Sequence, residues 1–484
     1  MNLVEHFKKF RRNIIGVDLI HDGKPIIYAD WTASGRLYQP IENFITNDIG
    51  PLIANTHTEA SFTGSAMTKL YHEAQQCIKN HVNADHNDSL ICAGAGMTTV
   101  VNKFQRILGL KIPEQYTDQI KREEQDKPVV FITHMEHHSN QTTWEECSVT
   151  VIRIPENSEG LPDDKALNEL LIKYADRPFK IGSFTACSNV TGIKIEYKQL
   201  AKIMHQHGGY CFIDFAASAP YVEIDMHPKD SMERLDAVMF SPHKFLGGPG
   251  SSGVLVFNKA LYKNKIPDHP GGGTVTWTNP WGKHHFYDDI EIREDGGTPG
   301  FLQTIRTALC IKVKDQMRVE NIQLREKQLV NIFFEGLNKI PNLQILHKRH
   351  KNRLCIISFY IPDIHFNLIV RLLSDRFGIQ SRGGCSCAGT YGHILLGVDE
   401  KTSQSITCQI DEGDLSRKPG WVRISSHPTS TDEDAYYIVE SIAKIENNIR
   451  EWEKNYEFDP SVGDYFPLQK NQTTLSLSEF DTRS

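Results

Sequence analysis

The sequence has few of the features that mark membrane, secreted or nucleic-acid-binding proteins. It contains no apolar run long enough to span a bilayer, and its N-terminus "MNLVEHFKKFRRNIIG" lacks the continuous apolar segment of a secretory signal. The formal net charge of -7 over 484 residues leaves no basic excess for nucleic acid or an anionic membrane. The ten cysteines include no C-x-x-C pair and form no disulfide framework. These absences predict a cytoplasmic protein with reduced cysteines and no metal site.

Seven short β-rich runs dominate the chain between residues 28 and 300. They are "SLICAG", "PVVFIT", "VTVIRI", "KIGSFTA", "YCFIDF", "DAVMFS" and "GVLVF". Helical patterns such as "DKALNELLIKY" and "EYKQLAKIMHQHG" lie between several of them. This alternation predicts an α/β fold with a mainly parallel, seven-stranded sheet that helices flank on both faces.

A chain of this length is expected to form two domains. From about Asn321 the pattern changes to a long charged helix, the run "RLCIISFYI" and two further helical segments, which is an α+β pattern. We therefore predict a large α/β domain over residues 28–307 and a smaller α+β domain made of residues 1–27 and 308–464. The polar residues 465–484 show no clear period and are predicted to form a flexible tail.

The stretch "FSPHKFLGGPGSSG" places Lys244 directly after an apolar run. A lysine after a strand is most often a solvated surface residue. However, ligands in open α/β sheets bind at the carboxyl ends of strands, and the glycines that follow allow the backbone to approach a ligand closely. A partly desolvated amine at this place would have a lowered pKa and could form a Schiff base.

Two other strand ends carry residues that suit the same chemistry. Asp214 ends "YCFIDF", where it either caps the next turn or keeps a pyridine nitrogen protonated, as pyridoxal phosphate requires. In "GAGMTTVVN" a glycine turn leads to Thr98 and Thr99 at the start of a helix, where free amides can bind phosphate. An ordinary helix cap has the same pattern.

The ordered motifs "GAGMTTVVN", "HMEHHSN", "TACSNVTG", "IDFAA", "SPHK", "GGTPG", "SRGGCSCAG" and "GWVRISSHPTSTDED" resemble the class V aminotransferase family of fold type I pyridoxal phosphate enzymes. Within that family the chain is most similar to cysteine desulfurases and selenocysteine lyases. The resemblance runs from about Tyr28 to Asp434. It implies a pyridoxal-phosphate-dependent transferase fold of type I, an amino acid substrate and a homodimer with its active sites at the subunit interface.

The resemblance also implies a role for each matching cofactor residue. Lys244 would form the Schiff base with pyridoxal 5'-phosphate, Asp214 would pair with the ring nitrogen, and His137 would stack on the ring. Asn189 would bind the ring hydroxyl. The phosphate would be held by Gly96, Met97, Thr98, Ser241, His243 and, from a second subunit, Thr298.

On the substrate side, Arg423 matches the arginine that binds the α-carboxylate, for which a guanidinium fork is well suited. Ala33, His57 and Arg382 match further positions near the substrate. Cys387 matches the desulfurase cysteine that attacks the substrate sulfur and becomes a persulfide, although neighbouring Cys385 is an alternative reactive or resolving thiol. A protein sulfur acceptor would follow from this chemistry.

The chain departs from the desulfurase pattern at several places. Ala217 replaces a glutamine, Cys385 and Ser386 replace a double histidine, and Thr58 replaces an arginine. The segment between Cys387 and Arg423 is longer than usual, and we predict that it forms a turn or hairpin beside the active-site mouth.

We predict a cysteine desulfurase that converts L-cysteine to L-alanine and leaves a persulfide on Cys387. The departures keep a selenocysteine lyase, a C–S β-lyase, an aminotransferase or an epimerase open. A non-catalytic binding or scaffold protein of the same fold is the alternative from a different class.

Overall fold

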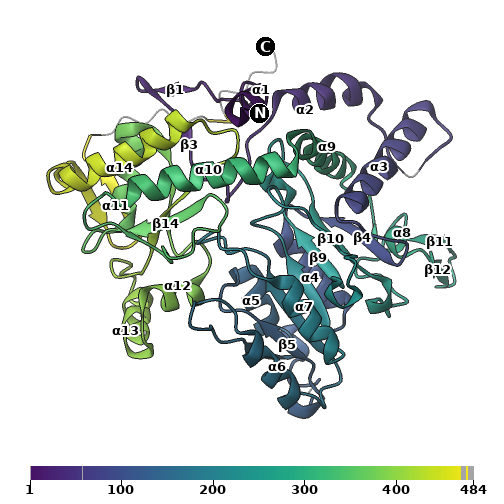
Figure 1. The fold of residues 1–484 in the computed structure, drawn as a ribbon. Helices are drawn as coiled ribbons and strands as arrows, with labels where there is room; N and C mark the ends of the chain where they lie inside the picture. Colours follow the sequence, from purple (N-terminus) through teal and green to yellow (C-terminus); the bar gives the residue numbers. More distant parts are fainter. Residues whose placement is uncertain (1, 57, 121, 470–475, 478–484) are drawn as a thin grey trace.

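The computed structural model describes residues 2–56, 58–120, 122–469 and 476–477. Figure 1 shows two parts, each built around its own sheet. The larger part lies at the lower right of the view and contains a seven-stranded sheet. The smaller part lies at the left and contains a four-stranded sheet.

The large sheet confirms the predicted strand count and its mainly parallel arrangement. Its strand order is β4-β10-β9-β8-β7-β5-β6. Strand β10 runs antiparallel to β4 and β9, whereas the other neighbours are parallel. The strands are β4 (Asp88–Ala93), β5 (Val129–Ile132), β6 (Thr150–Arg153), β7 (Lys180–Thr185), β8 (Tyr210–Asp214), β9 (Ala237–Phe240) and β10 (Gly253–Asn258).

Strands β5 and β9 are apolar along their whole length because helices cover both faces of the sheet. All four residues of β5 and of β9 are buried. On one face, the ring of Phe104 in α4 packs 5.0 Å from Phe212 and 5.1 Å from Phe257. The flanking helices are α4 (Met97–Ile107), α5 (His138–Glu145), α6 (Asp164–Lys173) and α7 (Tyr197–Gln206). Helices α3 (Phe62–His81) and α9 (Phe301–Met317) pack against each other beside β4 (Figure 1).

The smaller sheet is antiparallel, with the order β13-β14-β17-β16. Its strands are β13 (Gln344–Ile345), β14 (Ile356–Tyr360), β16 (Arg382–Gly384) and β17 (Trp421–Ser425). Helices α10 (Val319–Leu337), α11 (Phe366–Phe377) and α14 (Asp432–Trp452) share a separate apolar core with it. The N-terminal β3 (Ile27–Tyr28) joins this part by pairing in parallel with β15 (Ile379–Gln380). The domain boundaries themselves stay a prediction.

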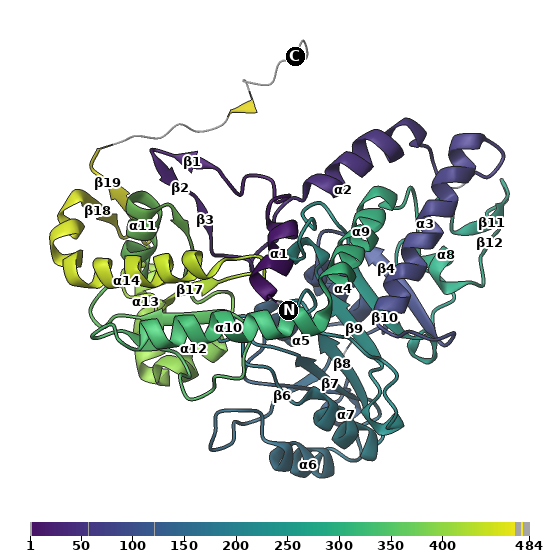
Figure 2. The same ribbon diagram turned by 45° about the horizontal axis from the view of Figure 1, so that its top comes forward.

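The remaining elements lie at the periphery. They are α1 (Leu3–Arg11), β1 (Ile20–His21), β2 (Lys24–Pro25), α2 (Gln39–Asn43), β11 (Val275–Thr278), β12 (His284–Phe286), α8 (Ile290–Glu294), β18 (Tyr456–Asp459) and β19 (Asp464–Pro467). Figure 2 shows the hairpin β11–β12 at the far edge of the larger part. Of the predicted tail, residues 470–475 and 478–484 lie outside the described residues. Within the described ranges, every helix is too short or too polar to cross a membrane.

The segment between Cys387 and Arg423 is helical, so the predicted turn or hairpin is wrong. It forms α12 (Gly389–Leu396) and α13 (Glu400–Asp411). Gly397 ends α12 in the left-handed conformation, with φ of 62°, and the Asp399 side chain accepts a 2.8 Å hydrogen bond from the Thr402 N–H to cap α13. Tyr391 is fully buried and anchors α12.

Candidate active site

Lys244 lies in a short turn directly after β9, at the carboxyl end of the strand. The turn is fixed by the neighbouring N-terminal segment, because the Gly35 N–H donates a 2.8 Å hydrogen bond to the His243 carbonyl. Burial lowers the pKa of Lys244 to about 8, and Arg423 and Arg382 act in the same direction, while Asp214 opposes them. An amine with this pKa is a better nucleophile and proton acceptor near neutral pH than a surface lysine.

Asp214 is the last residue of β8, the strand next to β9. Because the two strands are parallel, Asp214 and Lys244 reach the same cavity. The Asp214 carboxylate accepts a 2.7 Å hydrogen bond from the Ala216 N–H, while burial raises its pKa to about 6 and Lys244 acts in the opposite direction. A buried carboxylate here can pair with a protonated ring nitrogen.

The turn before α4 forms a small polar cradle at one end of the cavity. The Ser241 hydroxyl accepts a 2.8 Å hydrogen bond from the Met97 N–H, and Thr98 Oγ1 lies 2.6 Å from Ser139 Oγ. A Cβ atom on Gly96 would lie 3.1 Å from Ser241 Oγ, so a larger residue would narrow the cradle. Burial lowers the pKa of His243 to about 4, which keeps this imidazole neutral. The helix start and these donors suit a phosphate group.

His137 and Asn189 lie between the cradle and the smaller sheet. The His137 Nδ1 accepts a 3.1 Å hydrogen bond from the Ser139 N–H, and burial together with the Lys244 charge lowers the pKa of His137 to about 3. The Asn189 amide donates a 2.7 Å hydrogen bond to the Ser386 carbonyl. Its Oδ1 is buried with no hydrogen-bond partner among the described residues.

Arg423 enters the cavity from β17 and is only 2% exposed. One guanidinium nitrogen donates a 2.7 Å hydrogen bond to Asp30 Oδ1, and another donates a 3.1 Å hydrogen bond to the Asn189 carbonyl. Its Nε is buried without a partner in the described part of the chain. Arg382 on β16 is the cross-strand neighbour of Arg423 and lines the same cavity. The two cations suit an anionic substrate.

Cys387 lines the cavity, whereas Cys385 does not and packs instead against the main apolar core. Ser386 and Cys387 have φ angles of 52° and 56°, in the left-handed region that non-glycine residues seldom adopt. Two such residues in sequence place Cys387 in the cavity wall at a cost in backbone strain.

The structure therefore brings most of the predicted site residues into one cavity. The predicted residues that line it are Ala33, Gly96, Met97, Thr98, His137, Asn189, Asp214, Ser241, His243, Lys244, Arg382, Cys387 and Arg423. Thr298 does not line this cavity, and its assignment to the phosphate site of a second subunit stays a prediction. His57 lies outside the described residues. The individual roles stay predictions.

Sequence reasoning missed several polar groups in or behind the cavity wall, among them Asp30, Thr32 and Ser386. Asp30 holds Arg423, and the hydroxyls of Thr32 and Ser386 are buried in the cavity wall without partners among the described residues. With Asn189 Oδ1 and Arg423 Nε, four polar atoms of the wall thus lack a partner in the part of the chain that the structure describes. Buried polar atoms normally have a partner. Together with the cradle at Gly96, this donor and acceptor set fits pyridoxal phosphate with an amino acid.

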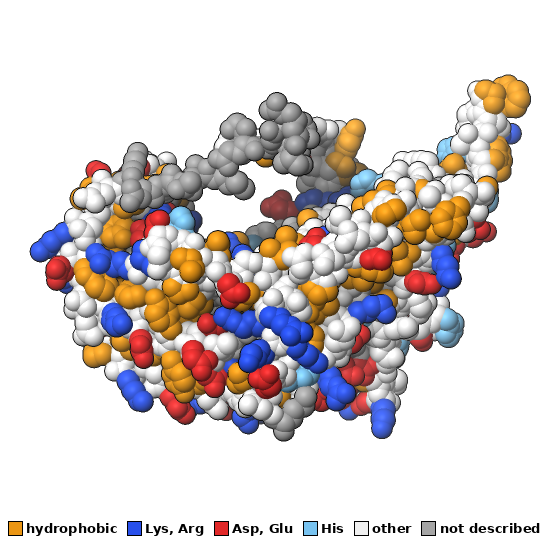
Figure 3. All heavy atoms as spheres, turned by 90° about the horizontal axis from the view of Figure 1, so that it is seen from above, with side chains coloured by type: hydrophobic (Ala, Val, Ile, Leu, Met, Phe, Trp, Pro, Cys, Tyr) orange, Lys and Arg blue, Asp and Glu red, His pale blue; other side chains and the backbone are white. Residues whose placement is uncertain are grey.

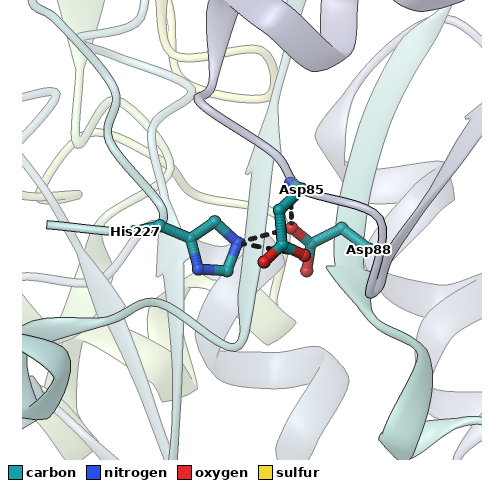
Figure 4. Close-up of side chains that lie close together, drawn as sticks. All are labelled: Asp85, Asp88 and His227. Carbon is teal, nitrogen blue, oxygen red and sulfur yellow. Dashed lines mark hydrogen bonds and ion pairs between the residues drawn. The ribbon is translucent and has the colours of Figure 1, made fainter.

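A second polar cluster lies away from the cavity, at the start of β4. Figure 4 shows the carboxylates of Asp85 and Asp88 close to the imidazole of His227. His227 Nε2 lies 2.6 Å from Asp88 Oδ2 and 3.8 Å from Asp85 Oδ1. The imidazole and the Asp85 N–H both bond to Asp88 Oδ2, so we assign this cluster a structural role in holding the 225–227 segment against β4.

The chain belongs to the class-V aminotransferase family, whose model matches residues 27–437. This is a family of pyridoxal-phosphate-dependent enzymes. The match covers both sheets and every residue of the cavity.

Curated relatives agree with this assignment. A probable cysteine desulfurase of Staphylococcus epidermidis is 27% identical over 371 residues, which is 76% of this chain and 84% of the relative. A protein of Staphylococcus aureus with the same description is 26% identical over the same shares.

Solved structures share the fold. The apo cysteine desulfurase of Thermococcus onnurineus has a TM-score of 0.73 at 21% identity, over 91% of this chain and 98% of that one. Cysteine desulfurase CsdA of Escherichia coli has a TM-score of 0.70 at 19% identity, over 90% and 98%.

Proposed function

We propose that this protein is a pyridoxal-phosphate-dependent cysteine desulfurase that converts L-cysteine to L-alanine and keeps the sulfur as a persulfide on Cys387. The observation that carries the proposal is that the Cys387 thiol shares one cavity with Lys244, Asp214 and Arg423. The curated relatives with the same described activity support it.

The cofactor, when bound, supplies an electron sink that acidifies the substrate Cα–H bond and weakens bonds at Cβ. Lys244 holds the cofactor and then moves a proton at the substrate Cα, for which its lowered pKa is suited. Asp214 keeps the ring nitrogen protonated, and Thr98, Ser241 and His243 hold the phosphate. Arg423 orients the substrate through its α-carboxylate.

Cys387 acts as the nucleophile in its thiolate form. Its sulfur attacks the substrate sulfur, a bond forms between the two sulfur atoms, and the bond between the substrate sulfur and Cβ breaks. The electron pair of the broken bond stays with the carbon fragment, which takes up a proton and leaves as alanine. The terminal sulfur remains on Cys387 until an acceptor thiol takes it.

The proposal is tested by a product assay on purified protein with L-cysteine and pyridoxal phosphate. We expect alanine in equal amount to sulfur, and a persulfide at Cys387 by mass spectrometry. Cys387→Ser is expected to abolish alanine formation, and undiminished turnover would contradict this mechanism. Pyruvate with ammonia would instead assign a C–S β-lyase, and failure to bind cofactor would favour a non-catalytic protein.

The enzyme is further proposed to work as a cytoplasmic homodimer in which Thr298 completes the phosphate site of a second copy. Apolar side chains on the hairpin β11–β12 support this arrangement, because Trp277 is 49% and Trp281 is 82% exposed in the single chain. Figure 3 shows hydrophobic side chains at the tip of the arm that projects at its upper right, where Figures 1 and 2 place this hairpin. All ten cysteines are unpaired, as in a reducing compartment.

A further inference from the structure

The segment that carries Cys387 is tied to the larger part of the molecule by three hydrogen bonds. Asn189 Nδ2 donates to the Ser386 carbonyl over 2.7 Å. The His138 N–H donates to the Cys387 carbonyl over 2.8 Å, and the Gly389 N–H donates to His138 Nε2 over 2.9 Å. His138 therefore bonds on both sides of the Cys387–Gly389 stretch, once through its backbone and once through its imidazole.

The imidazole of His138 completes the start of α12. Gly389 is the first residue of that helix, and the preceding N-cap residue, Ala388, has no side-chain acceptor. The first N–H groups of a helix have no partner within the helix, so an external acceptor is needed. A Cβ atom on Gly389 would lie 3.2 Å from His138 Nε2, which shows how closely the imidazole approaches this backbone.

This bond holds a conformation that the chain would otherwise avoid. The left-handed backbone of Ser386 and Cys387 is strained, and such conformations persist only where the surroundings fix them. We propose that His138 is a positioning residue that keeps the Cys387 thiol docked in the active site by accepting the Gly389 N–H. This inference rests on the proposed function for its catalytic meaning, but not for its structural test.

The hydrogen bond from the Gly389 N–H to His138 Nε2 requires a neutral imidazole, since a protonated Nε2 cannot accept a hydrogen bond. Burial lowers the pKa of His138 below its ordinary value, Lys418 acts in the same direction, and Glu145 opposes both. Neighbouring His137, whose pKa is lowered to about 3, stays uncharged. Because the pKa is lower in the docked form, the docked form is fully stable above about pH 6.5 and loses stability as the pH falls below that value.

The test compares the thiol reactivity of Cys387 in the holoenzyme with that of exposed Cys408 as an internal reference. Each variant is treated with iodoacetamide at pH 7.5, and alkylation at both cysteines is measured by peptide mass spectrometry. His138→Ala is expected to raise the Cys387 to Cys408 ratio about fivefold to tenfold, since one hydrogen bond is lost. His138→Gln supplies an amide oxygen as acceptor and is expected to stay within about twofold of the wild type.

His393→Ala serves as the matched control. The ring nitrogens of His393 lie 2.8 Å from the Gly389 carbonyl and 2.9 Å from Ser403 Oγ, so this histidine links α12 to α13. The substitution removes that link but leaves the bond from the Gly389 N–H to His138 in place. Its ratio is expected to match the wild type within about twofold. A rise in the Cys387 to Cys408 ratio equal to that of His138→Ala would mean that the whole segment loosens, and would overturn the proposed role of His138.

Two further readouts separate positioning from folding. In the wild type the ratio is expected to rise as the pH falls from 7.5 to 5.5, while in His138→Gln it stays flat. His138→Ala is expected to lower the kcat for alanine formation about tenfold with an unchanged KM and an unchanged visible spectrum of the bound cofactor. If His138→Ala does not fold, the pH comparison of His138→Gln with the wild type still decides the question.

Unchanged alkylation in His138→Ala, or a His138→Gln ratio as high as that of His138→Ala, overturns the inference. A wild-type protein that makes no alanine overturns the proposed function instead, and the alkylation ratios then still decide whether His138 holds the segment.

Discussion

The two sides of the cavity are built in different ways. The cofactor side, with Lys244, Asp214 and the turn at Gly96–Thr98, consists of residues that follow the strands of one sheet. The substrate side joins Asp30, Cys387 and Arg423, which come from distant parts of the sequence. The first side is rigid because its strands belong to one continuous hydrogen-bonded sheet. The second depends on a few side-chain bonds and a strained segment.

This difference in construction suggests that the two sides of the cavity have different functions. The cofactor side supplies chemistry that many amino acid substrates could use, whereas the substrate side decides which substrate enters and which bond breaks. The departures from the desulfurase pattern at Cys385 and Ser386 fall on the substrate side. Variants of the two sides should therefore differ in whether the cofactor spectrum changes.

The largest effect is expected from Lys244→Ala on the cofactor side. Loss of the amine that holds the cofactor and moves the proton should lower alanine formation about 10⁴-fold, measured with added pyridoxal phosphate. The visible absorption of the bound cofactor should also change. Lys202→Ala, which removes a surface lysine paired with Asp230, is the control and should stay within about twofold.

Arg423→Lys on the substrate side should act on binding alone. A lysine cannot reproduce the two-pronged contact with a carboxylate, so the KM for L-cysteine should rise about tenfold to hundredfold. The cofactor spectrum should not change. Asp30→Asn removes the partner of Arg423 and should have a smaller effect on KM. A spectral change in Arg423→Lys would show that the two sides are not independent.

A smaller effect is expected on the pH dependence of the free energy of unfolding, through the buried side chain of His427. His427 is buried, stacks on Trp31 at 4.3 Å, and burial lowers its pKa to about 3. The unfolded chain takes up a proton near pH 6.5 while the folded one does not, so stability is full above pH 6.5 and falls below it. As the pH falls from 7 to 5, the free energy of unfolding should decrease by about 2 kcal/mol because of His427. Urea titrations should show a shallower pH dependence in His427→Gln.

The smallest effect is expected from Cys385→Ser. Because Cys385 packs on the core and does not line the cavity, alanine formation should change by no more than about twofold. A loss of alanine formation comparable to that of Cys387→Ser, in the same assay, would move the nucleophile to Cys385. It would contradict our description of the substrate side.

The larger fold was predictable because its signals are local. Short apolar, β-rich runs identified all seven strands of the large sheet, and the rule that ligands bind at carboxyl ends of strands then placed Lys244 and Asp214 together. The helices α12 and α13 were missed although the cap residues Gly397 and Asp399 were visible. Helix α12 has only 8 residues, and α13 buries a single residue, Ile406, so neither shows a clear apolar period.

The substrate side was less predictable because it depends on register. Asp30 meets Arg423 only because β3 pairs with β15 and the chain then bridges to Ser425 at the end of β17. Pairings between distant strands leave no local trace in the amino-acid pattern.

The antiparallel direction of β10 has a consequence for how the reactive lysine is kept still. A parallel successor to β9 would require a long crossover, and the lysine would then sit at the free end of a strand. Instead the chain reverses over residues 241–252 and returns as β10, which pairs with β9. The turn that contains Lys244 therefore begins and ends in two strands that are hydrogen-bonded to each other. Thermal motion at Lys244 is thereby restrained from two directions, and this short return leaves little room for inserted residues.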